Sequence, residues 1–271
     1  YLSGNWSQLG TDINGASGGD EAGMAVSINY AGTRVAIGAY LSDEGGGDDS
    51  GSVRVFGYSS ETWSQLGSTI NGVSAGEKAG TQISLNASGN RLAIASSYSD
   101  ATGEDSGEVK VYEYASSSWS QLGGAINGEA AGDYSGSAGL SLSADGLKVA
   151  ISSVHNDSIN EQTGQIELYE YISNQWIQAG NDIEGNDLNG YFGRASINAD
   201  MTRIVASSIV YGASNKGRVW VYDIENTSTY DAPIITTTTL NHNEDISSTL
   251  VDRIQATDAD DDALTYALGG P

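Results

Sequence analysis

The sequence predicts an all-β protein: a β-propeller of four four-stranded blades, built from repeats of about 57 residues. Three observations lead to this prediction. The chain contains four copies of one sequence unit, and each copy reads as four short strands joined by polar turns. No segment has the spacing of apolar residues that marks a substantial helix. A repeated four-stranded meander is typical of propeller blades, whose faces must be covered by neighbouring blades.

A motif of Trp-Ser-Gln-Leu-Gly type defines the repeat. It begins at Trp6, Trp63 and Trp119, and a fourth version, Trp-Ile-Gln-Ala-Gly, begins at Trp176. The spacings are 57, 56 and 57 residues. In every copy an Ile follows three residues after the Gly of the motif, and a further Gly follows two residues later. This regularity predicts four units with one shared structure.

The second unit shows the expected strands most clearly. Strands are predicted near Gln82–Asn86, at Arg91–Ser96, at Val109–Tyr114 and at Trp119–Ile126. The third of these alternates apolar and polar residues at the period of two that strands require. Short polar turns between such runs predict an antiparallel meander.

The two ends of the repeat region complement each other. Residues 1–15 contain only a fourth strand, and the last unit, residues 193–224, contains only the first three. We therefore expect the N-terminal strand to complete the last blade and close a four-bladed ring, which leaves no free sheet edge. A fragment of a larger propeller, with more repeats before Tyr1, and a solenoid of stacked meanders are the alternatives.

Composition excludes several classes of protein. The 271 residues include 35 acidic and 11 basic side chains, for a net charge of −24, which argues against binding to nucleic acid. The absence of Cys excludes disulfides, a thiolate nucleophile and Cys-ligated metals. No apolar run reaches the roughly 20 residues of a membrane span. This acidity suggests an extracellular or cell-surface location.

Within the repeats, Gly23–Ile28, Arg34–Ala39 and Gly51–Tyr58 resemble the FG-GAP repeat of integrin α-chain propellers and related bacterial surface proteins. Tyr191-Phe192-Gly193 retains the Phe-Gly step of that family. The resemblance implies an adhesive role. The family's calcium loop between the first two strands is not carried over, because turns such as Asn29–Thr33 are too short and have too few carboxylates to supply 6–8 oxygen ligands.

The resemblance covers residues 1–224, which we expect to form the propeller, with a polar linker at 225–230. Residues 231–271 resemble the beginning of a bacterial cadherin-like module but are too few to complete one. We therefore expect a partial β-sandwich-like segment there. By that resemblance, the calcium ligands would be Asp258, Asp260 and Asp262, with Glu244 as a partner.

Acidic residues concentrate in the connections between the second and third strands and between units. In an up-and-down meander, these connections emerge on one face, which should therefore be strongly negative. The charge serves either solubility or Ca²⁺ binding by hard oxygen ligands beside Gly turns. The candidate Ca²⁺ ligands in these loops are Asp43, Asp48, Asp49, Asp100, Glu104 and Asp105.

The search for catalytic motifs finds none. The two His residues, His155 and His242, lie in different regions, and no nucleophile elbow, zinc motif or phosphate-binding loop is present. We therefore expect no enzymatic activity.

The recurring Trp residues allow two interpretations. They pack between or beneath blades, or they stack on sugar rings, as in a lectin with one pocket per blade. The candidate residues for ligand stacking are Trp6, Trp63, Trp119 and Trp176.

The sequence thus predicts a non-catalytic adhesion or structural module of a large secreted or cell-surface protein, with Ca²⁺ as a stabilising ion. The alternatives are a carbohydrate-binding, lectin-like propeller and a self-assembling filament or surface-layer subunit that adds a strand from its C-terminal segment. The expected partners are a cell-surface protein or glycan, or copies of the chain itself.

Overall fold

The computed structural model divides the chain into two compact units, Tyr1–Ile224 and Glu225–Pro271. It describes residues 4, 6–157, 162–185, 188–210, 216–224, 234–235 and 256–257. Every regular element among these residues is a β-strand, which confirms the all-β class. In the second unit, β19 (Ile234–Ile235) pairs antiparallel with β20 (Ala256–Thr257).

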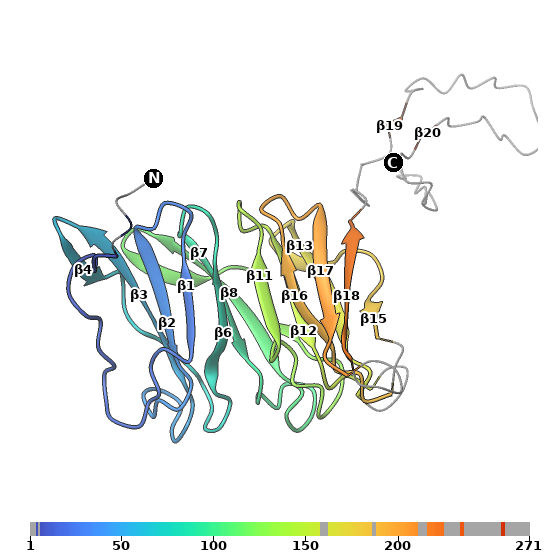
Figure 1. Ribbon diagram of the computed structural model, residues 1–271, viewed down its shortest axis with the longest axis horizontal. Helices are drawn as coiled ribbons and strands as arrows, with labels where there is room; N and C mark the ends of the chain where they lie inside the picture. Colours follow the sequence, from blue (N-terminus) through green and yellow to red (C-terminus); the bar gives the residue numbers. More distant parts are fainter. Residues whose placement is uncertain are drawn as a thin grey trace, which may run out of the picture. The chain divides into compact units, whose positions relative to one another are not determined.

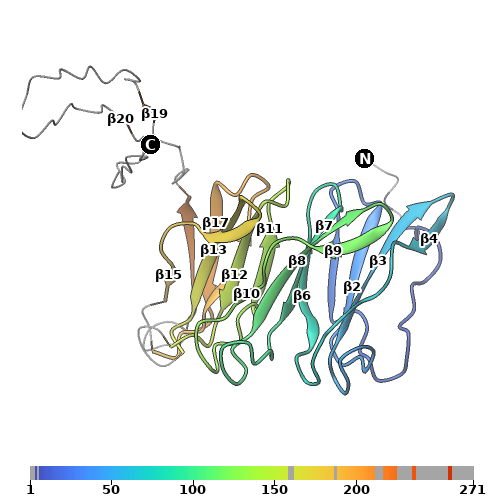
Figure 2. The same ribbon diagram turned by 180° about the vertical axis from the view of Figure 1, so that it is seen from behind.

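The first unit consists of four antiparallel sheets that follow one another in chain order (Figures 1 and 2). The first sheet contains β1 (Ala25–Ile28), β2 (Arg34–Ala39), β3 (Ser52–Ser59), β4 (Thr62–Gln65) and β5 (Ile70–Asn71). The second contains β6 (Ala79–Leu85), β7 (Arg91–Ser96), β8 (Glu108–Ala115), β9 (Ser118–Gln121) and β10 (Ile126–Asn127). The third contains β11 (Gly139–Leu142), β12 (Lys148–Ser153), β13 (Gln165–Ile172), β14 (Gln175–Gln178) and β15 (Ile183–Glu184). The fourth contains β16 (Phe192–Ile197), β17 (Arg203–Ser208) and β18 (Arg218–Asp223).

The turns between strands have a local cause in each unit. In the first turn, the Asn29 side chain accepts hydrogen bonds from the backbone N–H groups of Thr33 and Arg34, at 2.9 and 2.8 Å. The β3–β4 hairpin has a two-residue loop, Ser60 and Glu61, with φ of 50° and 63°. Positive φ at both positions is the geometry of a type I′ turn, whose twist matches that of the flanking strands.

In the first three sheets, the predicted fourth strand is observed in two pieces. In the first sheet, β4 pairs with one part of β3 and β5 pairs with another. Between them Leu66 donates its backbone N–H to Val55 at 2.8 Å, and Gly67 then takes a left-handed conformation with φ of +72°. The same division separates β9 from β10 and β14 from β15.

The N-terminal segment does not complete the fourth sheet as the sequence predicts. Residues 6–15 form no strand, and within the described ranges β18 pairs with β17 alone. The segment instead lies against the first sheet, where Leu9 accepts a hydrogen bond from the Trp63 indole at 2.8 Å and Asn14 accepts one from Arg54 at 2.7 Å. Four sheets are present, and their closure into one four-bladed ring remains a prediction.

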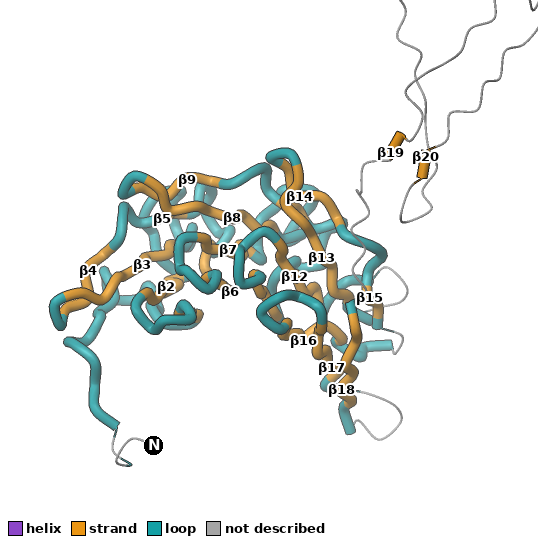
Figure 3. The backbone as a smooth tube through the Cα atoms, turned by 90° about the horizontal axis from the view of Figure 1, so that it is seen from above, coloured by secondary structure: helices purple, strands orange, loops and turns teal. Residues whose placement is uncertain are grey.

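The four sheets lie along an arc within the first unit (Figure 3). The first strands of successive sheets, β1, β6, β11 and β16, are neighbours. Three apolar cores fill the spaces between consecutive sheets. In the first of these, Val53 and Val55 of one sheet pack with Ile83 and Leu85 of the next. Each sheet therefore depends on its neighbours to bury its faces.

A second contact links consecutive units near their outer strands. The side chain of Trp119 donates its indole N–H to the backbone carbonyl of Leu66 at 2.8 Å, and Trp176 makes the same contact with Leu122. Each indole also lies beside a Tyr on the adjacent strand, as in Tyr114–Trp119, with ring centroids 5.1 Å apart. The Leu-Gly step of one unit is thus where the Trp of the next unit packs.

This contact predicts that Gly67 cannot be replaced without loss of stability. A Cβ at Gly67 would lie 2.9 Å from the Trp119 ring, on a residue whose φ of +72° already disfavours L side chains. We expect Gly67→Ala to lower the free energy of unfolding by about 2–4 kcal/mol in chemical denaturation. Gly76→Ala is the matched control, because φ there is +79° and the space around it is open; it should cost about 1 kcal/mol. Equal losses would show that the Trp contact contributes nothing.

Candidate functional site

The connections after the second strands and those between units meet on one face of the first unit, as the sequence predicts. The Gly76 N–H donates to the Asp48 carbonyl, and the Gly132 N–H donates to the Glu104 carbonyl, both at 2.9 Å. These bonds join each connection between units to the preceding long loop. We call this surface the loop face.

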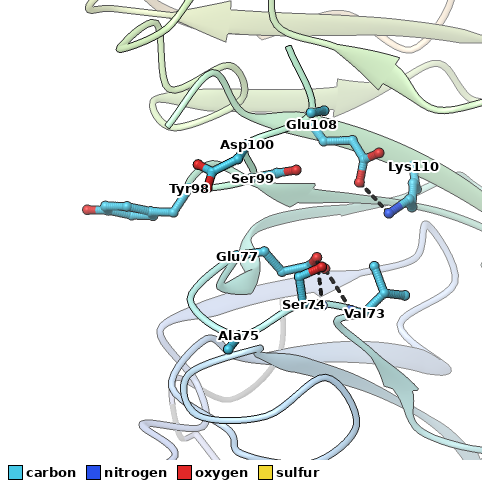
Figure 4. A pocket seen from close by; sticks show the side chains of 10 residues that line it. Val73, Ser74, Ala75, Glu77, Tyr98, Ser99, Asp100, Glu108 and Lys110 are labelled. Carbon is cyan, nitrogen blue, oxygen red and sulfur yellow. Dashed lines mark hydrogen bonds and ion pairs between the residues drawn. The ribbon is translucent and has the colours of Figure 1, made fainter. Parts of the chain in front are cut away.

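A cavity of about 330 Å³ opens at the loop face beside the second sheet (Figure 4). That volume lies within the range of small-molecule sites in proteins. The walls come from the connection before β6, the loop after β7 and the start of β8. The lining side chains that carry polar groups are Ser74, Glu77, Tyr98, Ser99, Asp100, Glu108 and Lys110.

Charged side chains in this cavity take part in two separate groups of contacts. Lys110 forms an ion pair with Glu108 on β8, and both side chains are largely buried. Glu77, also buried, accepts the backbone N–H groups of Val73 and Ser74 at 3.0 and 3.1 Å. Figure 4 shows these two groups of contacts as separate sets. Glu77 therefore holds its own loop, whereas Glu108 faces a cation.

The equivalent positions in the third unit carry different side chains. Glu167 on β13 takes the position that Lys110 has on β8, and Gln165 takes that of Glu108. Burial is the main cause that raises the pKa of Glu167 to about 7. The Tyr169 hydroxyl, which donates to Glu167 at 2.8 Å, opposes this shift, while the negative charges of Glu129 and Asp182 add to it.

Further carboxylates surround Glu167. The Gln165 amide donates to Glu129 at 3.1 Å, and the Asn156 amide donates to Asp133 at 3.3 Å and to Glu129 at 3.4 Å. Burial also raises the pKa of Asp133. This acidic cluster contains no Lys or Arg, so the two equivalent places in consecutive units differ in charge.

A row of rings runs along the loop face from the cavity. Tyr98, which lines the cavity, has its ring 5.3 Å from that of Tyr134; Tyr134 is 5.3 Å from His155, and His155 is 5.6 Å from Tyr191. On the other side of Tyr98, the Lys78 ammonium lies 4.3 Å from its ring centroid. We call Lys78, Tyr98, Tyr134, His155 and Tyr191 the aromatic row.

Three members of the aromatic row have unusual backbone conformations. Lys78, Tyr134 and Tyr191 occupy equivalent positions in successive units, with φ of 56°, 50° and 49°. Bulky residues rarely adopt this left-handed region, and such conformations concentrate at functional sites. Asp105 also holds Tyr134 through a hydrogen bond of 3.0 Å and is the first cause of the raised pKa of Tyr134.

Two of the loop carboxylates predicted as Ca²⁺ ligands accept hydrogen bonds within their own loops. Asp43 accepts the N–H of Asp49, and Asp100 accepts the N–H of Asp105, each at 2.9 Å. Asp48 and Glu104 provide the backbone carbonyls already described for the loop face. Across the described residues, no three Asp, Glu, His or Cys side chains meet in a group that could hold a metal ion.

The remaining predicted ligands lie outside the described residues. They are Glu244, Asp258, Asp260 and Asp262. Calcium binding therefore stays a prediction.

The four Trp residues predicted to stack on ligands lie away from the cavity. Trp63, Trp119 and Trp176 each donate a hydrogen bond to the preceding unit, and Trp6 is fully exposed. They lie on the fourth strands or, for Trp6, on the N-terminal segment, and they are not part of the aromatic row.

Sequence analysis did not select Glu108, Lys110 or Tyr98. A signal was present in the repeats. Aligning the units places Arg54, Lys110, Glu167 and Trp220 at one position, between neighbours that are always apolar. When the side chain at one position changes its charge from unit to unit while the neighbouring residues stay apolar, the pattern indicates that individual units differ in their surface chemistry.

No helix among the described residues is long and apolar enough to span a membrane.

No family model and no curated protein sequence matches this chain. Solved structures do match it. A protein from Bacteroides uniformis, provisionally named a 6-phosphogluconolactonase, aligns with a TM-score of 0.51 and 12% identity over 76% of this chain and 51% of that one. A periplasmic gluconolactonase from Pseudomonas aeruginosa gives 0.45 and 13%, over 75% and 58%. The β-propeller domain of the Trilobed protease from Pyrococcus furiosus gives 0.43 and 11%, over 74% and 54%.

These matches support a β-propeller fold. The chain spans about half the length of the solved proteins it resembles. The FG-GAP and cadherin-like resemblances find no counterpart among them.

The comparison corrects two sequence-based expectations. We expected no enzymatic activity. We also expected the chain to be a non-catalytic adhesion or structural module, with lectin-like and filament-forming modules as alternatives. The Bacteroides uniformis protein of similar fold is named as a lactonase, an enzyme, and this finding contradicts both expectations. At 12% identity the likeness itself shows the fold, so any activity must be argued from the residues of the site.

The raised pKa of Glu167 predicts a pH dependence of stability. Since the folded pKa of about 7 exceeds that of an exposed Glu, the folded state binds this proton more tightly, and the resulting stability is lost as pH rises through about 7. Glu167→Gln removes the buried charge and should raise the free energy of unfolding at pH 8 by about 1–3 kcal/mol, with little effect at pH 4. Thermal denaturation at both pH values tests this.

Glu61→Gln is the matched control, because Glu61 is exposed. It should change stability equally at both pH values. If Glu167→Gln behaves like this control, the Glu167 carboxyl ionises with an ordinary pKa and the acidic cluster tolerates its charge.

Proposed function

We propose that this protein is a hydrolase that opens a small, hydroxylated lactone or ester in the cavity of the second unit. The observation that carries the proposal is the Glu108–Lys110 ion pair in the wall of a cavity of about 330 Å³. A base and a cation side by side in a concave site are the two groups that acyl hydrolysis needs. The activity expected from the named lactonases of similar fold agrees with this chemistry.

The two side chains would have distinct tasks. Glu108 takes a proton from a water molecule, whose oxygen then attacks the acyl carbon of the substrate. Lys110 donates a hydrogen bond to the carbonyl oxygen, on which negative charge develops. When the bond from the acyl carbon to the leaving oxygen breaks, Glu108 returns its proton to that oxygen. The products are a carboxylic acid and a hydroxyl group, on one molecule if the substrate is a lactone.

The cavity favours an uncharged, hydroxylated substrate. Glu77, Asp100 and Glu108 face a single Lys110, so the charged groups around the cavity sum to about −2. A phosphate would be repelled, and in this respect the proposed substrate differs from the one in the name of the Bacteroides protein. Carboxylates and the hydroxyls of Ser74 and Ser99 can accept hydrogen bonds from sugar-type hydroxyl groups.

The aromatic row extends the site beyond the cavity. Tyr98 belongs to both, and Tyr134 stands next to it. Aromatic faces pack against the apolar faces of sugar rings as they do against other apolar groups. A substrate longer than one ring unit could therefore lie along the row. An extracellular location and Ca²⁺ binding by the loops remain separate proposals, because neither the ion pair nor the cavity requires them.

The proposal predicts that Glu108→Gln slows turnover strongly while binding persists. Removing the base should lower kcat by about 10²–10⁴-fold, and Lys110→Met should lower it by about 10²–10³-fold. Acid release from an uncharged aldonolactone, followed in a pH-stat, measures this rate. A 6-phosphorylated lactone should be hydrolysed more slowly than its uncharged counterpart.

Glu113→Gln is the matched control. Glu113 is on the same strand and is also ion-paired, to Arg91 at 3.0 Å, but it does not line the cavity. It should retain the wild-type rate. The proposal is wrong if the wild-type protein releases no acid from lactones or esters, or if Glu108→Gln and Glu113→Gln have the same rate.

A further inference from the structure

The first sheet has an uncovered apolar face. Val26 and Ile28 on β1 are 69% and 61% exposed, whereas their equivalents on β6, Ile83 and Leu85, are each only 7% exposed. The difference arises because the second sheet packs against the first, while no sheet among the described residues covers the first one on this side. This face also has a shallow apolar hollow lined by residues of β1, β2 and Ile13.

The fourth sheet has the opposite apolar face uncovered. Val219 and Val221 on β18 are 65% and 70% exposed, whereas their equivalents on β3, Val53 and Val55, are 0% and 2% exposed. In the interior of the unit, Val53 and Val55 pack against the β6 face. The two uncovered surfaces are thus the two halves of an interface that the chain already builds three times.

Polar groups of that interface are also left over at the ends. Inside the unit, the Leu85 N–H donates to Ser27 at 2.9 Å, and the Leu142 N–H donates to Ser84 at 3.0 Å. By repeat position, the last acceptor of this series is Ser196 on β16, and the donor that would match it is the Ile28 N–H on β1. Donor and acceptor therefore lie at opposite ends of the arc.

The N-terminal segment lies in the position of a fourth strand. Leu9 accepts the Trp63 indole N–H as Leu66 accepts that of Trp119, so residues 6–14 lie beside the first sheet where the fourth strand of a preceding blade would lie. Among the described residues, β18 pairs with β17 and with no strand on its other side. A sheet packed on the β1 face would bring its outer edge to this segment.

We propose that two copies of the chain associate head to tail. The β16–β18 face of each copy packs on the β1–β2 face of the other, and residues 6–14 of each copy complete the fourth sheet of the other. The inference is independent of the proposed hydrolase activity.

The arc favours a second copy over closure within one chain. Figure 3 shows the first and fourth sheets at opposite ends of the arc. The alignment with the Bacteroides uniformis protein covers 51% of that longer chain, a share that agrees with an arc forming about half of a larger ring. Two arcs would close a ring of eight sheets and leave no uncovered face or free edge.

The first experiment measures mass by sedimentation velocity on the 271-residue chain. The wild-type protein should sediment as a pair, at twice 28.1 kDa. Val221→Glu and Ile28→Glu each damage one face, and each variant alone should be a monomer at the concentration where the wild-type protein is paired. A mixture of the two should pair again, because one of its two interfaces joins undamaged faces. Leu188→Glu is the matched control, since Leu188 is also 61% exposed but belongs to neither face; it should remain paired.

The second experiment uses the absence of Cys from the chain. Ser7 and Asp223 occupy the positions of Ser64 and Gly57, which face each other across β4 and β3. A Ser7→Cys, Asp223→Cys double variant should therefore form a disulfide between two copies under mild oxidation, seen as a band of doubled mass on a non-reducing gel. Neither single variant should form this band.

Three outcomes would overturn the proposal. A disulfide within one chain would show that the four sheets close on themselves. A wild-type monomer whose mass and melting temperature Val221→Glu leaves unchanged would show that the end faces stay uncovered. Species that grow without limit as concentration rises would show head-to-tail contact that does not close.

Discussion

Apolar contact between consecutive sheets is the interaction on which the rest of this structure depends. Each core combines residues of two consecutive sheets: Ala36 and Leu92 belong to the first core, and Ala93 and Val149 to the second, all of them inaccessible to solvent. A single four-stranded sheet has no such partner of its own. The fold is therefore a property of the series of sheets, and the stability of any unit depends on its two neighbours.

The loop face follows from this packing. Since successive sheets pack against each other, the connection between two units reaches the long loop of the preceding unit and bonds to it through Gly76 or Gly132. The cavity forms where this connection, the loop after β7 and the start of β8 leave space. Left-handed conformations at Lys78, Tyr134 and Tyr191 precede the first strands of the second, third and fourth sheets, and each of these turns carries a side chain of the aromatic row.

Much of the architecture could be predicted from the sequence, because a repeat shows the same pattern several times. The period of the Trp motif, the alternation in Val109–Tyr114 and the short polar turns between such runs all led to the observed sheets. The partner of the N-terminal segment could not be predicted, because a lone fourth strand has the same sequence whether it serves its own chain or another. The site was also missed, because motif searches look for fixed spacing. Glu108 and Lys110 line a cavity only together with residues from other parts of the chain, such as Glu77 and Tyr98.

The position shared by Arg54, Lys110, Glu167 and Trp220 has a wider consequence. It lies between residues that hold the sheets together, yet its own side chain differs in every unit without disturbing the sheet around it. Along this strand, residues that hold the sheets together thus alternate with a residue whose side chain can vary. A new cation, anion or ring can be introduced into one unit by a single codon change, and duplication of units multiplies the number of places where such a change can be tried.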